Sequence, residues 1–374
     1  MPVHYTRREF LQQAAAWAAA GVVGSRRGEA AAGDNGNPWL HPARFWRPLA
    51  NNRIQCCLCP RGCVVAPNER GACGARENRG GAYYTMVYGK VCAQRLDPIE
   101  KDPLHHVYPG TRTLGIATAS CNLSCKFCIN WQMAQARPED TQYAYLTPAQ
   151  VVAQAQRNQC GGIAYTYTEP VNFIEYALDV AAAARRAGLL NVCHTAAYVQ
   201  PEPLRALCAA MDAINVDLKG FTDSFYQEVC GGHLQPVLDS LKLIRQQGTW
   251  LEITYLVLPT LNDKADQVGA MCEWIKRELG PDTPLHFTRF SPAYRLKNLP
   301  ATSAKTLEEM QRVAFQAGLR YTYIGNLPGH AGESTYCPKC NGRLIWRVAY
   351  QVRGFYLRKG RCPGCGLPIP GLWG

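Results

Sequence analysis

Three cysteines in one short run are the residues of this chain best suited to metal chemistry. They are Cys121, Cys125 and Cys128, spaced as C-x3-C-x2-C. Three thiolates this close can bind three irons of one [4Fe–4S] cluster. The fourth iron then lacks a protein ligand and can take a small molecule, as the open position of a catalytic zinc does. The spacing favours such a cluster over zinc, whose ligands are usually paired as C-x2-C.

Two more cysteine groups have metal-ligand spacing. The N-terminal group is Cys56, Cys59, Cys63 and Cys73, with Cys57 as a possible substitute. Its four thiolates can bind zinc or a second iron–sulfur cluster, and spacing does not choose between them. The C-terminal group consists of Cys337, Cys340, Cys362 and Cys365. Two C-x2-C pairs so arranged predict a zinc ribbon.

The total of eighteen cysteines is high for a chain of 374 residues. In a secreted protein such a count suggests disulfides, but the grouping here argues for metals. The ungrouped cysteines are mostly flanked by apolar residues, which predicts buried inert thiols. They are Cys92, Cys160, Cys193, Cys208, Cys230 and Cys272.

The elements that must position the cysteine triad (Cys121, Cys125 and Cys128) alternate in type along the chain. Short β-rich segments bounded by turns occur at 114–119, 162–167, 191–195, 213–218, 251–258, 285–290 and 320–324. Helical patterns lie between them, at 148–157, 171–187, 203–211, 237–247, 263–279 and 304–317. Such alternation predicts an α/β fold with a parallel sheet. There are too few units for a full eight-unit barrel, so we expect a partial (β/α)6-type TIM-like barrel.

Polar residues stand where several of these strands end. Glu169 follows the second strand, Lys219 follows the fourth, and His286 lies in the sixth. The triad itself comes just after the first strand. Functional residues of α/β barrels cluster at the C-terminal ends of the strands. Each residue alone is more simply a solvated or capping group, but together they predict a binding site.

Several motifs follow one another in a characteristic order. They are R-I-Q-C-C-L-C-P-R-G-C from 53, D-P-I-E-K-D-P-L-H-H at 97–106, T-Y-T-E-P at 166–170, N-V-D-L-K-G-F at 215–221, L-V-L-P-T-L-N-D at 256–263 and Y-I-G-N-L-P-G at 323–329. T-Y-C-P-K-C and C-P-G-C-G follow near the C-terminus. Over about residues 53–374 the chain resembles the AmmeMemoRadiSam-system radical S-adenosylmethionine (SAM) family. That family is related to the pyruvate formate-lyase activating enzymes.

The resemblance implies a function and roles for the residues. The triad would hold a [4Fe–4S] cluster whose open iron takes the amino and carboxylate groups of SAM. Asp217 and Lys219 would lie near SAM, with Lys219 on its carboxylate, Glu169 on its ammonium and His286 on ribose or adenine. Reductive cleavage of SAM would give a 5′-deoxyadenosyl radical that removes hydrogen from a substrate, while the protein orients and shields the chemistry.

The partners stay open at this stage. The electron donor would be a flavodoxin- or ferredoxin-like protein. The substrate is a small molecule or a protein, and by analogy with the activases it would be a backbone glycine of a partner protein. The alternative of another class is a non-catalytic protein that binds metal clusters and nucleic acid.

The sequence departs from the activase pattern at two places. Where the activases have Gly-Gly-Glu-Pro, this chain has Tyr167-Thr168-Glu169-Pro170. Where relatives show Thr-Asn-Gly-Tyr near the third strand, it has Thr195-Ala196-Ala197-Tyr198. The glutamate is kept, but the glycines are lost at both places.

The two ends of the chain differ from the middle. Arg7 and Arg8 precede an Ala-rich apolar stretch and an A-x-A site, which predicts a twin-arginine export signal over 1–32. Export to the periplasm or cell envelope would conflict with chemistry that needs cytoplasmic SAM and electrons. The stretch is too short for a membrane span. A linker over 33–52, a cysteine module over 53–111, the barrel over 112–330 and a tail over 331–374 complete the predicted organisation.

The tail carries much of the net charge of +12. Its arginines (Arg343, Arg347, Arg353, Arg358) alternate with aromatic residues (Trp346, Tyr350, Phe355, Tyr356). Basic and aromatic side chains together can bind nucleic acid by charge and stacking. The simpler interpretation is that the aromatic side chains form the small core of the ribbon.

Overall fold

The computed structural model describes residues 40–373. Its strands are β1 (His41–Pro42), β2 (Trp46–Pro48), β3 (Ile54–Cys56), β4 (Val64–Val65), β5 (Arg76–Arg79), β6 (Ala82–Thr85), β7 (Lys90–Pro98), β8 (Arg112–Thr118), β9 (Ala144–Tyr145), β10 (Gly162–Tyr165), β11 (Leu190–Thr195), β12 (Ala213–Asp217), β13 (Trp250–Val257), β14 (Leu285–Arg289), β15 (Thr322–Gly325), β16 (Thr335–Tyr336), β17 (Arg343–Val348) and β18 (Gln351–Phe355). Its α-helices are α2 (Trp131–Ala134), α3 (Pro148–Arg157), α4 (Ile174–Arg186), α5 (Pro201–Ala210), α6 (Asp223–Phe225), α7 (Leu234–Gln247), α8 (Ala265–Glu278) and α9 (Ala304–Ala317).

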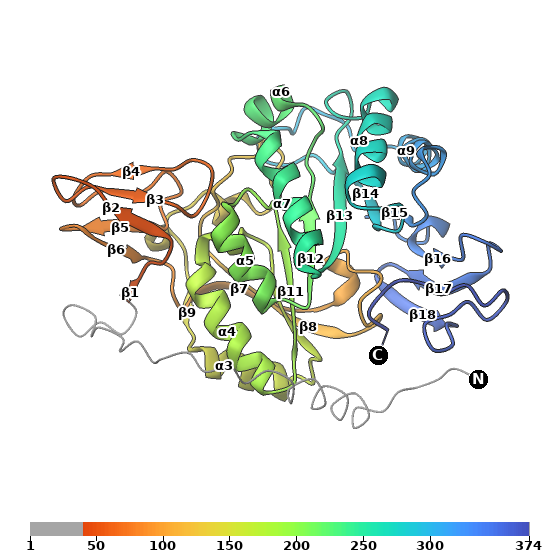
Figure 1. Ribbon diagram of the computed structural model, residues 1–374, viewed down its shortest axis with the longest axis horizontal. Helices are drawn as coiled ribbons and strands as arrows, with labels where there is room; N and C mark the ends of the chain where they lie inside the picture. The colour runs from red at the N-terminus through yellow and green to blue at the C-terminus, as the bar shows by residue number, and fades with distance from the viewer. Residues whose placement is uncertain (1–39, 374) are drawn as a thin grey trace.

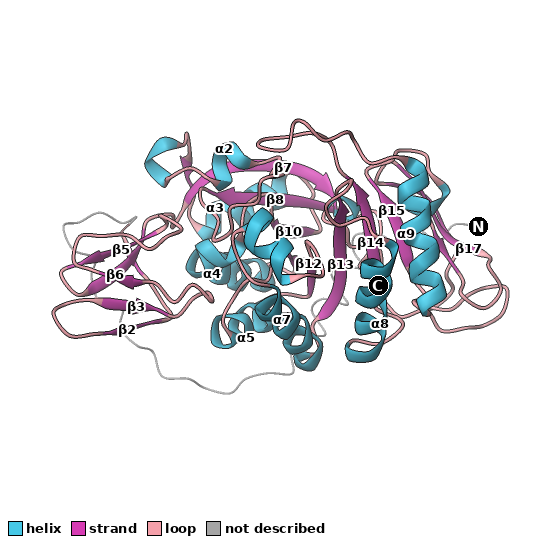
Figure 2. Ribbon diagram, turned by 90° about the horizontal axis from the view of Figure 1, so that it is seen from above, coloured by secondary structure: helices cyan, strands magenta, loops and turns pink. Residues whose placement is uncertain are grey.

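A large sheet forms the middle of the molecule. Its strand order is β15-β14-β13-β12-β11-β10-β8-β7-β9. The strands that run parallel to one another are β8, β10, β11, β12, β13, β14 and β15. β7 and β9 extend it as antiparallel strands. The helices α3, α4, α5, α7, α8 and α9 connect successive parallel strands (Figures 1 and 2). The predicted α/β fold with a mostly parallel sheet is confirmed, and the finer barrel geometry stays a prediction.

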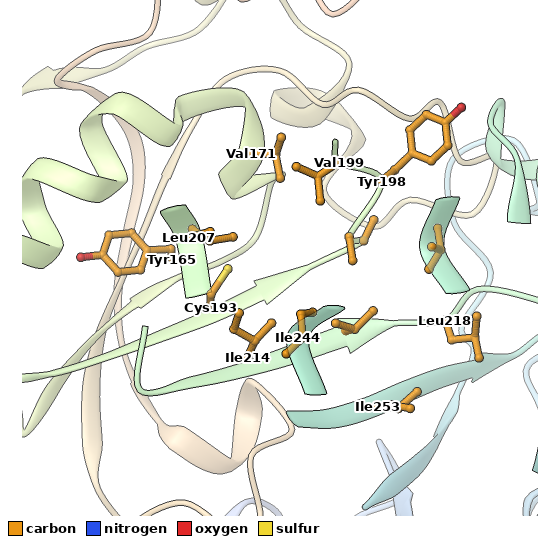
Figure 3. Packing of buried hydrophobic residues seen from close by; sticks show 14 of the residues in the cluster. Tyr165, Val171, Cys193, Tyr198, Val199, Leu207, Ile214, Leu218, Ile244 and Ile253 are labelled. Atoms are coloured by element: carbon orange, nitrogen blue, oxygen red, sulfur yellow. The ribbon is translucent and has the colours of Figure 1, made fainter. Parts of the chain in front are cut away.

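The central strands are buried along most of their length because helices and loops cover the sheet. Every residue of β10 is buried, as are the first four of β12. This is the pattern of parallel strands with both faces covered. Leu207 of α5 and Ile244 of α7 are buried with Ile214 of β12 and Ile253 of β13 in one core (Figure 3).

The N-terminal module lies at one end of the molecule (Figure 1). It consists of two small sheets, with the orders β1-β6-β5 and β2-β3-β4. β1 and β2 fall within the range predicted as a linker, and they pair with β6 and β3. β7 falls within the range predicted for the module, yet it pairs with β8 in the central sheet. The predicted export signal over 1–32 lies outside the described residues.

The C-terminal tail lies at the opposite end (Figure 1). Its three strands form a sheet with the order β16-β17-β18. The last residues pair with the loop before β8, since Tyr108 donates its backbone N–H to Leu372 O at 2.7 Å and Leu372 donates to His106 O at 2.7 Å. In the described part of the chain, no helix has the length and apolar character needed to cross a membrane.

Candidate active site

The loop after β8 carries the cysteine triad and is fixed by backbone hydrogen bonds. Ser124 and Lys126 donate their N–H groups to the carbonyls of Cys230 and Val229, at 2.8 and 2.9 Å. Leu123 N–H points at Cys121 Sγ over 3.4 Å. This amide lowers the pKa of the Cys121 thiol, but burial outweighs it and raises that pKa well above its usual value. A bound metal would favour the thiolate, which is the form that binds it.

All three thiols of the triad line one cavity of ≈ 530 Å³. The same cavity is lined by Glu169, Asp217, Lys219 and His286. These residues come from the C-terminal ends of β10 and β12 and from β14. The structure therefore brings together the residues that the sequence proposed for the triad cluster and for SAM. The volume lies within the range of small-molecule and cofactor sites.

Lys219 lies beside the triad and forms an ion pair. Its Nζ is 2.9 Å from Asp217 Oδ2 and 5.7 Å from the centre of the Phe127 ring, which lies between two triad cysteines in sequence. Burial would raise the pKa of Asp217, but Lys219 and His194 outweigh it and hold that pKa well below its usual value. The site thus contains a charged Asp217–Lys219 pair at the cavity wall.

Glu169 is buried, and its carboxylate is oriented by donors on neighbouring segments. Oε1 accepts from Thr195 Oγ1 at 2.6 Å and from Val171 N at 3.1 Å, and Oε2 accepts from Ala196 N at 2.9 Å. Burial raises the pKa of this carboxyl, and the hydrogen bonds oppose the rise. Glu169 therefore presents a fixed negative or acceptor group to the cavity.

His286 is held from behind by a buried carboxylate. Its Nε2 lies 2.7 Å from Glu252 Oε2, and its ring stacks on Tyr323. Glu252 also accepts the backbone N–H groups of His105 and His106, at 3.0 and 2.8 Å. With Nε2 occupied, the imidazole can offer a ligand only its other edge or a ring face.

Sequence reasoning missed four residues near the site. His194 Nε2 lies 2.9 Å from Asp217 Oδ1, and its Nδ1 lies 3.9 Å from Asp102. His194, Asp102 and Tyr350 all line the cavity. Cys230, expected to be an inert thiol, is a neighbour of Cys125, and a hydrogen bond from its thiol lowers the pKa of Cys125. Only His194 carried a usable signal, since it lies at the end of β11.

The two places where glycine is lost keep a left-handed backbone. Tyr167 has φ 66° and Ala197 has φ 50°. Residues with a Cβ pay about 1–2 kcal/mol for this conformation. Tyr167 is held by a 2.7 Å hydrogen bond to Asp97, and a Cβ on Gly115 would lie 2.4 Å from its hydroxyl. This chain thus adopts the left-handed backbone at both places without glycine.

The two other cysteine groups differ in compactness. In the C-terminal group, Cys337 and Cys365 approach to 3.5 Å, as do Cys340 and Cys362, and all four sulfurs lie within 4.8 Å of one another. Within residues 40–373, no other set of three or more potential metal ligands is that compact. The triad and the N-terminal thiols are therefore more widely spaced. The compact group can hold a single metal ion.

The basic and aromatic residues of the tail are only partly exposed, with Trp346 and Tyr356 among the exposed ones. Arg347 is buried and pairs with Glu100, while Phe355 packs near Trp373. Arg343 covers the ring of Trp346 instead of standing free. A nucleic-acid partner is unsupported.

Comparison with known proteins identifies the central domain. The sequence model of the radical SAM superfamily matches residues 116–273. The uncharacterized protein MJ0808 of Methanocaldococcus jannaschii is 43% identical over 332 residues, which cover 88% of this chain and 99% of that protein. The chain belongs to the radical SAM superfamily. The pyruvate formate-lyase-activating enzyme of Clostridium pasteurianum is 22% identical over 223 residues, covering 54% of this chain and 90% of the relative.

Among solved structures, a radical SAM methyltransferase from Sphaerobacter thermophilus is similar with a TM-score of 0.48 and 14% identity. The match covers 60% of this chain and 71% of the methyltransferase chain. Superfamily membership implies a [4Fe–4S] cluster and SAM, and it supports an enzyme over a non-catalytic metal-binding protein. The residues present fit the cluster, because three thiols line one cavity and cysteine thiolates are the usual ligands of such clusters.

Proposed function

We propose that this protein is a radical SAM enzyme that cleaves SAM reductively and uses the resulting 5′-deoxyadenosyl radical to remove hydrogen from a substrate. The observation that carries the proposal is the single cavity shared by the three triad thiols, Lys219 and Glu169. When bound, the cluster supplies one electron that breaks the sulfonium bond of SAM. The chain's own groups bind and orient SAM and exclude water.

The charged groups of the cavity suit the two charges of the methionine end of SAM. Lys219 would donate to the SAM carboxylate, and Glu169 would accept from its ammonium. Asp217 holds Lys219 in place through an ion pair of 2.9 Å. His194 in turn holds Asp217 through a second ion pair of 2.9 Å. His286, fixed by Glu252, would contact ribose or adenine through its free edge.

The finer features of the function are part of this proposal. The motif order supports a place in the AmmeMemoRadiSam-system family, and the compact C-terminal cysteines suit a zinc ion. The electron donor would be a flavodoxin- or ferredoxin-like protein. The similarity to an activating enzyme favours, as a second candidate, action on a backbone glycine of a partner protein. Export through a twin-arginine signal is a proposal that rests on residues 1–32 alone.

The test is SAM cleavage by the anaerobically reconstituted, reduced protein. We expect 5′-deoxyadenosine even without substrate, and we expect Cys125→Ala to abolish both its formation and the visible absorption of the triad cluster. Cys272→Ala is the control, because Cys272 is buried on α8 and does not line the cavity. No 5′-deoxyadenosine from the unaltered protein, or undiminished formation by Cys125→Ala, would refute the proposal.

A further inference from the structure

The four N-terminal cysteines gather at one place although they come from separate turns. Cys59 has Cys56, Cys63 and Cys73 as electrostatic neighbours. A hydrogen bond of 2.9 Å from Cys56 N to Cys63 O brings two of these segments together. Cys57 is directed elsewhere, because its Sγ contacts Gln55 O at 3.7 Å. The group that faces one centre is therefore Cys56, Cys59, Cys63 and Cys73.

These thiols are less compact than the four C-terminal ones. Four sulfurs about 2.3 Å from one tetrahedral zinc stand about 3.8 Å apart. The C-terminal cysteines meet that requirement, while no three of the N-terminal thiols lie within 4.8 Å of one another. Thiolates that cap different irons of a cube stand further apart than ligands of one ion. In this respect the N-terminal group resembles the triad and not the tail.

Two buried polar groups lie beside these thiols. Arg76 Nε has no hydrogen-bond partner in the described part of the chain, and the Tyr83 hydroxyl has no partner there other than the Cys56 thiol. Both side chains are at least 98% buried, and both are electrostatic neighbours of Cys56 and Cys73. A Cβ built on Gly71 would lie 3.1 Å from Tyr83 Oη and 3.9 Å from Cys63 Sγ, so the hydroxyl and this thiol flank one glycine.

Unpartnered buried donors are costly unless something accepts their hydrogen bonds. The sulfides and thiolates of an iron–sulfur cluster are such acceptors, and hydrogen bonds to them tune its potential. Arg76 also carries a positive charge. On one side its Nη2 lies 2.5 Å from Glu175 Oε1. A net negative cluster on the other side would be attracted by this buried arginine and would accept a hydrogen bond from its Nε.

The module touches the triad loop directly. Ser120, the residue before Cys121, donates its hydroxyl to Cys73 O at 2.7 Å. Arg61, between two of the module's cysteines, donates to Asn122 O at 2.8 Å and to Gly231 O at 2.6 Å. Hydrogen bonds of Cys73 and Arg61 thus join the module directly to the triad loop.

We propose that Cys56, Cys59, Cys63 and Cys73 hold a second [4Fe–4S] cluster, with all four irons ligated, that relays single electrons to the triad cluster. A reduced flavodoxin-type donor would lose one electron, the module cluster would gain it and then pass it to the triad cluster, where SAM cleavage consumes it. The metal site stands on its own geometry, and the relay rests on the proposed function.

Metal content tests the site without relying on SAM chemistry. A variant with Cys121→Ala, Cys125→Ala and Cys128→Ala lacks the triad ligands. After anaerobic reconstitution it should keep about four irons and four sulfides per chain, half those of the unaltered protein, with a reducible cluster signal. Adding Cys340→Ser and Cys365→Ser should remove zinc and leave this iron in place. A triad variant with zinc and no iron in the module would overturn the site.

A complementary variant keeps the triad and covers the case in which the first does not fold. Cys56→Ala with Cys59→Ala should also lose half of the iron, and the remaining cluster should still respond to SAM in its electron paramagnetic resonance spectrum. With reduced flavodoxin as donor, this variant should form 5′-deoxyadenosine at least tenfold more slowly at unchanged SAM affinity. An undiminished rate would overturn the relay.

Failure of this inference differs from failure of the proposed function. If the chain does not cleave SAM, the iron content of the triad variant still reports on the module. Tyr83→Phe in that variant adds a redox readout, since loss of a donor to the cluster should make its reduction potential more negative. A structural zinc would give no such signal.

Discussion

The two outer regions dock on the central domain in the same way but treat their cysteines differently. Each inserts a buried arginine opposite a buried glutamate of the central part. In the module, Arg76 lies 2.5 Å from Glu175 of α4. In the tail, Arg347 lies 3.5 Å from Glu100. Since breaking a buried pair leaves an uncompensated charge, both contacts fix the position of an otherwise small unit.

The difference lies in what else each arginine touches. Arg347 donates to Thr335 Oγ1 at 2.8 Å and to His105 O at 2.6 Å, so its docking contacts satisfy it. Arg76 keeps an unpartnered Nε beside the module's thiols. The tail therefore separates docking from metal binding, whereas the module joins them. A cluster in the module would stabilise the docked state, and the tail metal would stabilise only the tail.

Metal removal should give the largest effect and separates the two regions most sharply. A zinc chelator should unfold the tail locally, because a structural zinc contributes on the order of 10 kcal/mol and the tail core is small, built around residues such as Leu344 and Leu357. Under anaerobic conditions the module should keep its iron. Hydrogen exchange of β17 against β3 measures this, and continued protection of β17 after metal loss would contradict it.

Removing one docking glutamate should have the next largest effect. Glu175→Ala should cost about 3–5 kcal/mol, since Arg76 is left buried and unpaired. Glu100→Ala should cost about 1–3 kcal/mol, because Arg347 keeps its other hydrogen bonds. The measurement is denaturant unfolding of both variants without metal.

The control is Glu139→Ala, which breaks a surface pair with Arg70 and should cost at most about 1 kcal/mol. Loading the module with iron should reduce the Glu175→Ala loss and leave the Glu100→Ala loss unchanged. Equal losses from Glu175→Ala and Glu139→Ala would show that the module docks without this pair.

A change in the cavity between the regions should disturb neither of them. Lys219→Met should weaken SAM binding about ten- to a hundredfold, since a charge-assisted hydrogen bond contributes roughly 1.5–3 kcal/mol. Iron and zinc content should stay the same. SAM titration followed by calorimetry measures the change, with Lys242→Met, from a surface pair with Asp239, as control. An unaltered SAM affinity would remove Lys219 from the binding site.

The smallest expected effect is a pH dependence of the folding stability. It reports on the cavity alone, because Arg76 and Arg347 stay charged over this pH range. Burial would lower the pKa of His194, but Asp217 and Asp102 outweigh it, so the pKa is raised. The charged imidazole therefore stabilises the fold fully below about pH 6.5 and loses this contribution as pH rises through its folded-state pKa. The stability difference from His194→Gln should shrink as the pH rises above about 6.5. A pH-independent difference would contradict the raised pKa.

The sequence predicted the repeated strands and helices within a few residues of their bounds. Long apolar runs between turns carry this signal, as at β13 and α9. The strands of the module were not predicted, since two- to four-residue strands such as β1 and β4 are too short to show a period. β7 was also missed, and its place beside β8 depends on pairing that residues 90–98 do not reveal by themselves.

The site was predictable where strand order forces residues together. Glu169 and Lys219 follow parallel strands, so their shared edge of the sheet could be inferred. Asp102 reaches the cavity from the loop before β8, and Tyr350 reaches it from the tail. No local sequence pattern indicates either position. The inward turn of Arg347 was likewise hidden, because a basic residue among aromatics looks the same in sequence whether buried or exposed.

The sequence by itself determined the chemistry available to this protein: three groups of thiols, a parallel α/β core and charged residues at strand ends. It did so because spacing and periodicity are local properties. Tertiary structure alone decided how far apart the thiols of each group stand, and that the N-terminal module lies against the triad loop. Those distances depend on contacts between segments remote in the chain, such as Arg61 with Asn122 and Ser120 with Cys73.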